Sequence, residues 1–151
     1  NELVRNNEPF GNAPLAEFFE ILDQFKLFEG VDADNIGVVG QCLTGGFVLH
    51  AAIRPEVKAP VVFHHSFGWK GSGIPKNCSS LIDKKVQGHS SYVDPFCPVW
   101  RVKKLETELH GNLEAHWYAL PHGIPHLFFN NEQGRSAFDK MGKFFETQLG
   151  Q

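Results

Sequence analysis

The sequence is short of cysteine, of net charge and of long apolar runs, and each shortage excludes a class of protein. Its three cysteines, at positions 42, 78 and 97, form no C-x-x-C pair and no balanced disulfide set, which favours free thiols in a reducing compartment. A net charge of -3 gives no electrostatic reason to expect a nucleic-acid partner. No apolar run approaches the roughly 18 residues of a membrane span, and no signal peptide is visible. We therefore expect a cytoplasmic protein with neither a membrane nor a nucleic-acid partner.

What the sequence does contain is an alternation of helix and strand patterns over 151 residues, a length typical of one domain. Short β-branched runs predict strands, and apolar residues three and four apart predict helices. Such alternation is typical of a mostly parallel sheet with helices on both faces, an α/β fold. The expected elements are a helix between 12 and 30, a strand at 36–39, a helix ending before Pro55, strands at 59–63 and, most weakly, 79–88, a loop at 89–98, a helix with its apolar face at 99–109, a strand within 113–120, and a last helix with its apolar face at 138–149.

One reactive side chain lies between a predicted strand and a predicted helix, in the stretch I-G-V-V-G-Q-C-L-T-G-G-F (36–47). A tight strand-to-helix turn with a lone nucleophile at its apex is a nucleophile elbow, here with Cys42 in place of serine. The N–H of Leu43 is then a natural oxyanion donor, and the start of the helix favours a thiolate. The alternative is that Cys42 is a small buried hydrophobic residue, as free cysteines usually are.

A cysteine nucleophile also needs a base, and a third group that orients the base. In the α/β-hydrolase arrangement the chain order is nucleophile, acid, histidine. Asp94 and His126 occupy those places, each in a loop after a predicted strand, and His122 is the rival for the role of base. Each residue also has an ordinary interpretation, since an Asp before Pro often only forms a turn. The three together, in order, favour a catalytic site.

These segments resemble the dienelactone hydrolase family. The resemblance is carried by G-V-D-A-D-N-I-G-V-V-G-Q-C-L-T-G-G-F, V-K-A-P-V-V, V-D-P-F-C-P and P-H-G-I-P-H-L-F-F-N, and it covers nearly the whole chain from Pro14 onward. It implies an α/β-hydrolase-like three-layer sandwich that cleaves small esters or lactones without a cofactor. By the resemblance Cys42 is the nucleophile, which forms a thioester acyl-enzyme, Asp94 is the orienting acid and His126 is the base.

The sequence departs from the family pattern in two places. Thr44 stands where many members have glycine, and threonine is small enough to be tolerated. The family normally has several strands before the elbow helix, whereas this sequence begins almost at that helix. The missing strands would carry the second oxyanion donor. Because a sheet that starts at the nucleophile strand leaves an unpaired edge, we expect residues 1–151 to be a single domain that forms the C-terminal part of a longer chain.

Three other interpretations stay open. The chain could be a catalytically inactive hydrolase-like domain that serves binding or scaffolding, since fold does not imply function. A glutamine amidotransferase-like enzyme also uses a cysteine elbow, but it has a glutamate two residues after its histidine, where this sequence has Phe128. A metal could be held by some of the eight histidines, such as His64 and His65 with His122 or His126. Adjacent histidines in a strand point to opposite faces and no H-E-x-x-H is present, so we expect no metal.

Overall fold

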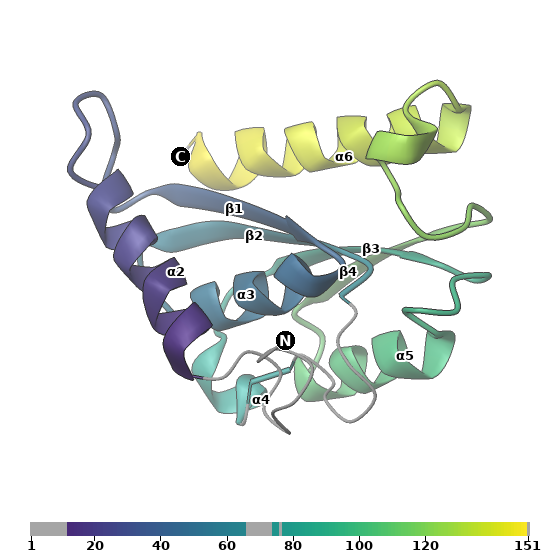
Figure 1. Ribbon diagram of the computed structural model, residues 1–151, viewed down its shortest axis with the longest axis horizontal. Coiled ribbons are helices and arrows are strands. Elements are labelled where there is room, and N and C mark those ends of the chain that lie inside the picture. The colour runs from purple at the N-terminus through teal and green to yellow at the C-terminus, as the bar shows by residue number, and fades with distance from the viewer. Residues whose placement is uncertain (1–11, 66–73, 76, 151) are drawn as a thin grey trace.

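In the computed structural model, which describes residues 12–65, 74–75 and 77–150, four parallel strands form a sheet in the order β1-β2-β3-β4 (Figure 1). Each strand pairs in parallel with the next strand along the chain. The strands are β1 (Ile36–Gln41), β2 (Val57–Phe63), β3 (Val86–Ser91) and β4 (Leu113–Tyr118). The helices are α2 (Asn12–Phe25), α3 (Leu43–Ala51), α4 (Cys78–Leu81), α5 (Val99–Glu108) and α6 (Glu132–Leu149), with a 3-10 turn, η1 (His126–Phe128).

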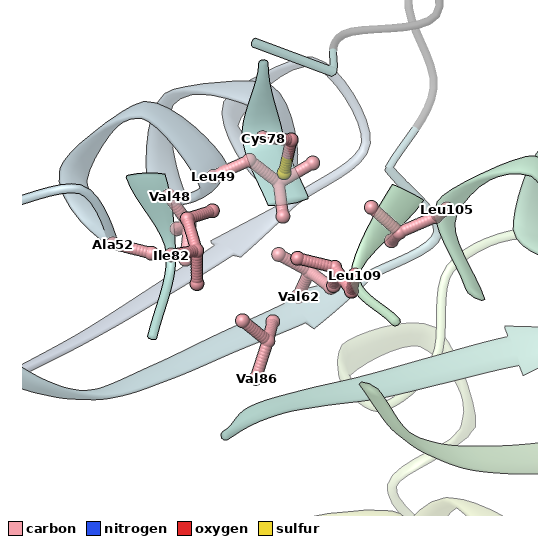
Figure 2. Packing of buried hydrophobic residues seen from close by; sticks show 9 residues of the cluster. All are labelled: Val48, Leu49, Ala52, Val62, Cys78, Ile82, Val86, Leu105 and Leu109. Atoms are coloured by element: carbon pink, nitrogen blue, oxygen red, sulfur yellow. The ribbon is translucent and has the colours of Figure 1, made fainter. Parts of the chain in front are cut away.

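Helices cover both faces of the sheet, as the alternating pattern predicts. α6 lies on one face, and α2, α3 and α5 lie on the other (Figure 1). Successive side chains of β2 point to opposite faces, so Val61 and Phe63 pack in the cluster under α6, whereas Val62 packs in the cluster between α3 and α5. Figure 2 shows this second cluster, which contains Val48, Leu49, Ala52, Val62, Cys78, Ile82, Val86, Leu105 and Leu109.

The predicted strand at 79–88 is wrong in position. Residues 78–81 form the short helix α4, and the strand runs instead over Val86–Ser91, which includes three residues that we expected in a loop. Every residue of β3 is buried. Its polar side chains bond within the protein: the ring of His89 meets the hydroxyl of Tyr118 at 2.9 Å, and the hydroxyl of Ser91 donates to the carbonyl oxygen of Leu120. A buried strand made of polar residues has no apolar pattern by which it could be recognised.

A residue with a reactive or titratable side chain follows the carboxyl end of each strand. These residues are Cys42 after β1, His64 after β2, Asp94 shortly after β3 and His122 after β4. Because the strands are parallel neighbours, their carboxyl ends lie along one edge of the sheet, which is where ligands bind in open α/β sheets. The fold therefore gathers these four residues at that edge.

Strand β1 lies at a side of the sheet. Among the described residues it pairs only with β2, and the side chain of Val39 is 52% exposed. An outer strand of this kind presents unpaired N–H and C=O groups.

None of the helices in the described part of the chain is both long and apolar enough to cross a bilayer.

Candidate active site

Cys42 occupies a strained turn between β1 and α3. Its backbone has φ 54° and ψ -118°, a region that side-chain-bearing residues rarely adopt. Glycines on both sides permit the turn. A Cβ on Gly40 would lie 2.4 Å from the carbonyl oxygen of Thr44, and one on Gly45 would lie 3.0 Å from the Cα of His65. The turn therefore has the geometry of a nucleophile elbow, and its cysteine is only partly buried.

Thr44 closes this turn with its hydroxyl. The Thr44 Oγ1 atom accepts from the N–H of Gln41 at 2.8 Å and donates to the carbonyl oxygen of the same residue, also at 2.8 Å. The threonine that departs from the family pattern thus satisfies both backbone groups of the residue before Cys42. Leu43 is the first residue of α3, so its N–H belongs to the first turn, where no partner within the helix is available.

Asp94 is buried and surrounded by hydrogen-bond donors. It is 3% exposed, and its Oδ1 atom accepts from the backbone N–H of Phe96 at 2.8 Å and of Cys97 at 3.2 Å. Its Oδ2 atom lies 2.7 Å from Nδ1 of His122 and 3.1 Å from Nδ1 of His64. Burial alone would raise the pKa of the Asp94 carboxyl, but the contacts with the two histidines and with the N–H of Phe96 outweigh it, so this pKa lies well below its usual range. Asp94 is therefore a carboxylate.

The histidine that contacts Asp94 is His122. Its side chain is 23% exposed, and its ring lies between the ring of Phe96, at 5.2 Å, and that of His64, at 4.8 Å. The residue expected to be the base, His126, begins η1 and is exposed. Its side chain makes no hydrogen bond or ion pair within the described part of the chain. Gly123 and Ile124 turn inward between the two histidines, which brings the first to Asp94 and leaves the second at the surface. The geometry thus favours the rival, His122.

One hydrogen bond holds the elbow beside the loop that carries His122, and a second ties it to the end of β2. The Nε2 atom of Gln41 donates to the carbonyl oxygen of Ile124 at 3.1 Å, and the N–H of Cys42 donates to the carbonyl oxygen of Phe63 at 2.9 Å. No motif in the sequence singles out Gln41. The signal available was its position, directly before the nucleophile, but a glutamine there has several possible partners, and the sequence does not identify which one it meets.

The other two thiols differ from Cys42 in their surroundings. Cys78 and Cys97 are both fully buried. Burial raises the pKa of the Cys78 thiol to about 11, and burial together with the charge of Asp94 raises that of Cys97 to about 12. A thiol with such a pKa is protonated and inert at neutral pH. Cys42 is therefore the one described cysteine whose surroundings suit a nucleophile.

His64, Asp94 and His122 are also the described residues that could hold a metal ion, since their ligand atoms lie within 4.8 Å of one another. Ligands of a tetrahedral zinc ion, each about 2.0–2.1 Å from the metal, would lie about 3.3 Å apart. The 2.7 Å separation between His122 and Asp94 is shorter and has the length of a charge-assisted hydrogen bond. The donor set therefore fits an acid–base pair better than a metal centre.

Comparison with known proteins relates this geometry to a family. A model of the dienelactone hydrolase family matches residues 6–146. No curated protein matches the chain significantly.

Solved structures share the fold at low sequence identity. A protein of Klebsiella pneumoniae, provisionally assigned as a dienelactone hydrolase, is 20% identical with a TM-score of 0.70 over 87% of this chain. An α/β-hydrolase enzyme from a Medee basin deep-sea metagenome is 15% identical (TM-score 0.68, 93% of this chain), and the carboxylesterase of Bacillus cereus is 17% identical (TM-score 0.61, 85%). The chain spans 60%, 66% and 60% of the lengths of these three proteins. The likeness shows an α/β-hydrolase-like fold.

Proposed function

Because the chain belongs to the dienelactone hydrolase family, we propose that it hydrolyses small esters or lactones with Cys42 as nucleophile, His122 as base and Asp94 as the orienting acid. The observation that carries this proposal is the 2.7 Å contact between His122 Nδ1 and Asp94 Oδ2, at the same sheet edge as the strained turn of Cys42. A nucleophile, a base and a group that orients the base are the parts that covalent acyl transfer requires.

In the first half of the proposed reaction the acyl group moves to the cysteine. The contact with Asp94 places the proton of neutral His122 on Nδ1, so its Nε2 atom carries the lone pair that accepts the thiol proton of Cys42. The Sγ atom then attacks the carbonyl carbon and forms a tetrahedral oxyanion. The N–H of Leu43 donates to this oxyanion, a contribution of about 3–4 kcal/mol per donor in comparable sites. Protonated His122 returns its proton to the leaving alcohol, and a thioester remains.

In the second half water releases the acid. His122 Nε2 takes a proton from a water molecule, whose oxygen attacks the thioester carbonyl. The tetrahedral intermediate collapses with Cys42 as leaving group, and His122 returns the proton to its sulfur. For a lactone, both products are parts of one molecule, a hydroxy acid. Throughout the cycle Asp94 keeps its charge and stabilises the protonated form of His122.

The test is the hydrolysis of p-nitrophenyl acetate by the full-length protein and by Cys42→Ala, combined with mass spectrometry of the quenched reaction. We expect wild-type protein to release p-nitrophenol and to carry one acetyl group on the peptide that contains Cys42. We expect Cys42→Ala to do neither. Equal turnover by both proteins, or acetylation elsewhere with none on Cys42, would refute the assignment of the nucleophile.

Alkylation with iodoacetamide gives a second test with an internal control. Because Cys78 and Cys97 are fully buried and have raised pKa values, we expect only Cys42 to be modified in the folded protein, and all three cysteines to be modified in urea. If Cys42 is inert and no ester is turned over, the proposal fails and the chain is a hydrolase-like binding domain instead.

A further inference from the structure

A second histidine contacts the proposed catalytic acid, and the reaction scheme above gives it no role. His64 follows β2 and is completely buried. Its backbone has φ 44°, a left-handed conformation that histidine, asparagine and aspartate adopt more readily than other side-chain-bearing residues. The ring lies between the carboxylate of Asp94 and the loop that carries His122.

The contacts of His64 favour one position for its ring proton. The Nε2 atom lies 2.9 Å from the backbone N of Ile124, whose N–H can donate to it, and 3.2 Å from the carbonyl oxygen of the same residue, to which it could only donate. The shorter contact, together with the carboxylate beside Nδ1, favours an unprotonated Nε2. The proton of the neutral ring is therefore on Nδ1, which lies 3.1 Å from Asp94 Oδ2. This contact is an ion-pair approach whose alignment falls outside that of a hydrogen bond, and no other described residue bonds to Nδ1. His64 thus places Nδ1 against the carboxylate at one end of its ring and holds the Ile124 peptide at the other.

Asp94 Oδ2 is consequently shared by two histidines. His122 Nδ1 lies 2.7 Å from this oxygen and His64 Nδ1 lies 3.1 Å from it, and the two rings are 4.8 Å apart. Because two backbone N–H groups bind the other oxygen, the whole carboxylate is fixed in orientation. Ile124 lies two residues after His122, so the contact of its N–H with His64 also fixes the loop from which His122 extends.

We propose that His64 is a positioning residue, which orients the base His122 by holding both its acid partner and its loop. The inference rests on the proposed function for its kinetic consequence, but the orientation of His122 can be measured without turnover. A rigid ring with a donor at one end and an acceptor at the other spans the two contacts, which no aliphatic side chain could do. At metal sites, outer-shell partners that orient a functional histidine typically change activity by about 10–100-fold when they are removed, and we expect an effect of that order here.

The experiment compares wild-type full-length protein with His64→Phe, His64→Asn and His64→Gln. Phenylalanine keeps the ring but removes both contacts. Asparagine can place an N–H near the position of Nδ1 and tolerates the left-handed backbone, whereas glutamine can place an acceptor near the position of Nε2. The readouts are kcat and KM for p-nitrophenyl acetate, and the low-field proton NMR resonance of the hydrogen bond between His122 and Asp94, identified by its loss in His122→Gln.

We expect His64→Phe to lower kcat by about 10–100-fold with little change in KM, and to shift or broaden the His122 resonance. His64→Asn should recover part of kcat and of the resonance. Unchanged kcat and resonance in folded His64→Phe would overturn the proposal. If that variant does not fold, equal kcat and equal resonances in wild type, His64→Asn and His64→Gln would overturn it instead.

A matched control separates positioning from a general loss of packing. His89 is equally buried, but its ring bonds to Tyr118 and Gln87 rather than to Asp94. We expect His89→Phe to lower stability and to leave kcat and the His122 resonance unchanged. If the wild-type protein turns over no ester but His64→Phe still moves the resonance, the proposed function fails while the positioning role stands. Equal shifts of the resonance in the His64 and His89 variants would overturn that role.

Discussion

The nucleophile half and the base half of the candidate site are held in place by different kinds of contact. Around Cys42 the turn depends on the absence of side chains at Gly40 and Gly45 and on short hydrogen bonds to the backbone. Around Asp94 the geometry depends on a buried charge with hydrogen-bond donors on both oxygens. The geometry of the nucleophile half should therefore be sensitive to added side-chain volume. That of the base half should be sensitive to changes of charge and protonation.

The largest effect is expected in the base half, from Asp94→Asn. The two backbone N–H groups at Oδ1 would keep the amide oxygen on their side, so the NH2 group would face His122. His122 would then have to carry its proton on Nε2, where it cannot accept one from Cys42, and we expect kcat to fall by about 10⁴-fold. Hydrolysis of p-nitrophenyl acetate, with far-UV circular dichroism to confirm the fold, measures this. A loss of less than tenfold would contradict it.

The two histidines of the following loop provide a matched pair of substitutions. His122→Gln removes the proposed base and should lower kcat by about 10²–10⁴-fold. His126→Gln changes an exposed side chain and should leave kcat within about twofold. The same hydrolysis assay measures kcat of both variants. A large loss in His126→Gln with little change in His122→Gln would assign the role of base to His126.

Two buried histidines, His65 and His89, should make the stability of the protein sensitive to acid. Burial lowers the pKa of His65 to about 3 and that of His89 to about 2. Below about pH 6.5 the unfolded chain therefore binds protons that the folded protein does not, so the free energy of unfolding should fall by about 1.4 kcal/mol per pH unit for each histidine, down to about pH 3. Protonation of Asp94, whose pKa is lowered by folding, adds to this loss below about pH 4.

Urea denaturation at pH 7, 6 and 5 measures this slope. In His89→Gln one of the two histidines with a lowered pKa is gone, so we expect the slope between pH 6 and pH 5 to be about half that of the wild type. If the free energy of unfolding does not change over this interval, folding does not lower the pKa of either histidine.

In the nucleophile half, Gly40→Ala tests the sensitivity to volume. Its Cβ would overlap the carbonyl group of Thr44, and we expect a loss of about 1–3 kcal/mol of stability together with lower activity. Gly142 in α6 is the control, because a Cβ there meets nothing within 4 Å, so Gly142→Ala should stabilise the protein by about 0.5–1 kcal/mol. Thermal denaturation compares the two. Equal effects would mean that the elbow is not sterically constrained.

The smallest effect is expected from Thr44→Val, which removes the hydroxyl that bonds to the backbone of Gln41. Because Thr44 is exposed, water can replace these bonds, and we expect a loss of about 1 kcal/mol in urea denaturation. Thr44→Ser keeps the hydroxyl and should lie closer to the wild type. A valine variant as stable as the serine variant would show that the hydroxyl does not close the turn.

Most of the fold follows from patterns that the sequence displays. The run at 59–63 is apolar because both faces of its strand are covered, whereas the run at 36–39 is recognisable although its Val39 side chain is half exposed. The helical spacing before Phe25 reflects one buried face. The strand at Val86–Ser91 could not be recognised in this way. Its buried side chains Gln87, His89 and Ser91 bond to other side chains and to a loop, and local sequence does not reveal where those partners lie.

The candidate site divides in the same manner. The elbow could be predicted because its requirements are local: a glycine, a nucleophile and small residues in a fixed order. The sequence could not predict which of His122 and His126 contacts Asp94, because both follow the same strand and only the path of the loop decides this. The contact of His64 with Asp94 joins residues 30 positions apart, across two strands of the sheet.

The loop after β4 is held through its backbone at Ile124. The amide of Gln41 binds the carbonyl oxygen of this residue, and the ring of His64 binds its N–H. Every amino acid except proline supplies both groups, so the attachment does not depend on which residue stands at 124. That side chain is completely buried, however, so its volume is constrained by the packing around it. Position 124 should therefore accept another apolar residue of similar volume, whereas positions 41 and 64 need side chains that preserve a donor or an acceptor.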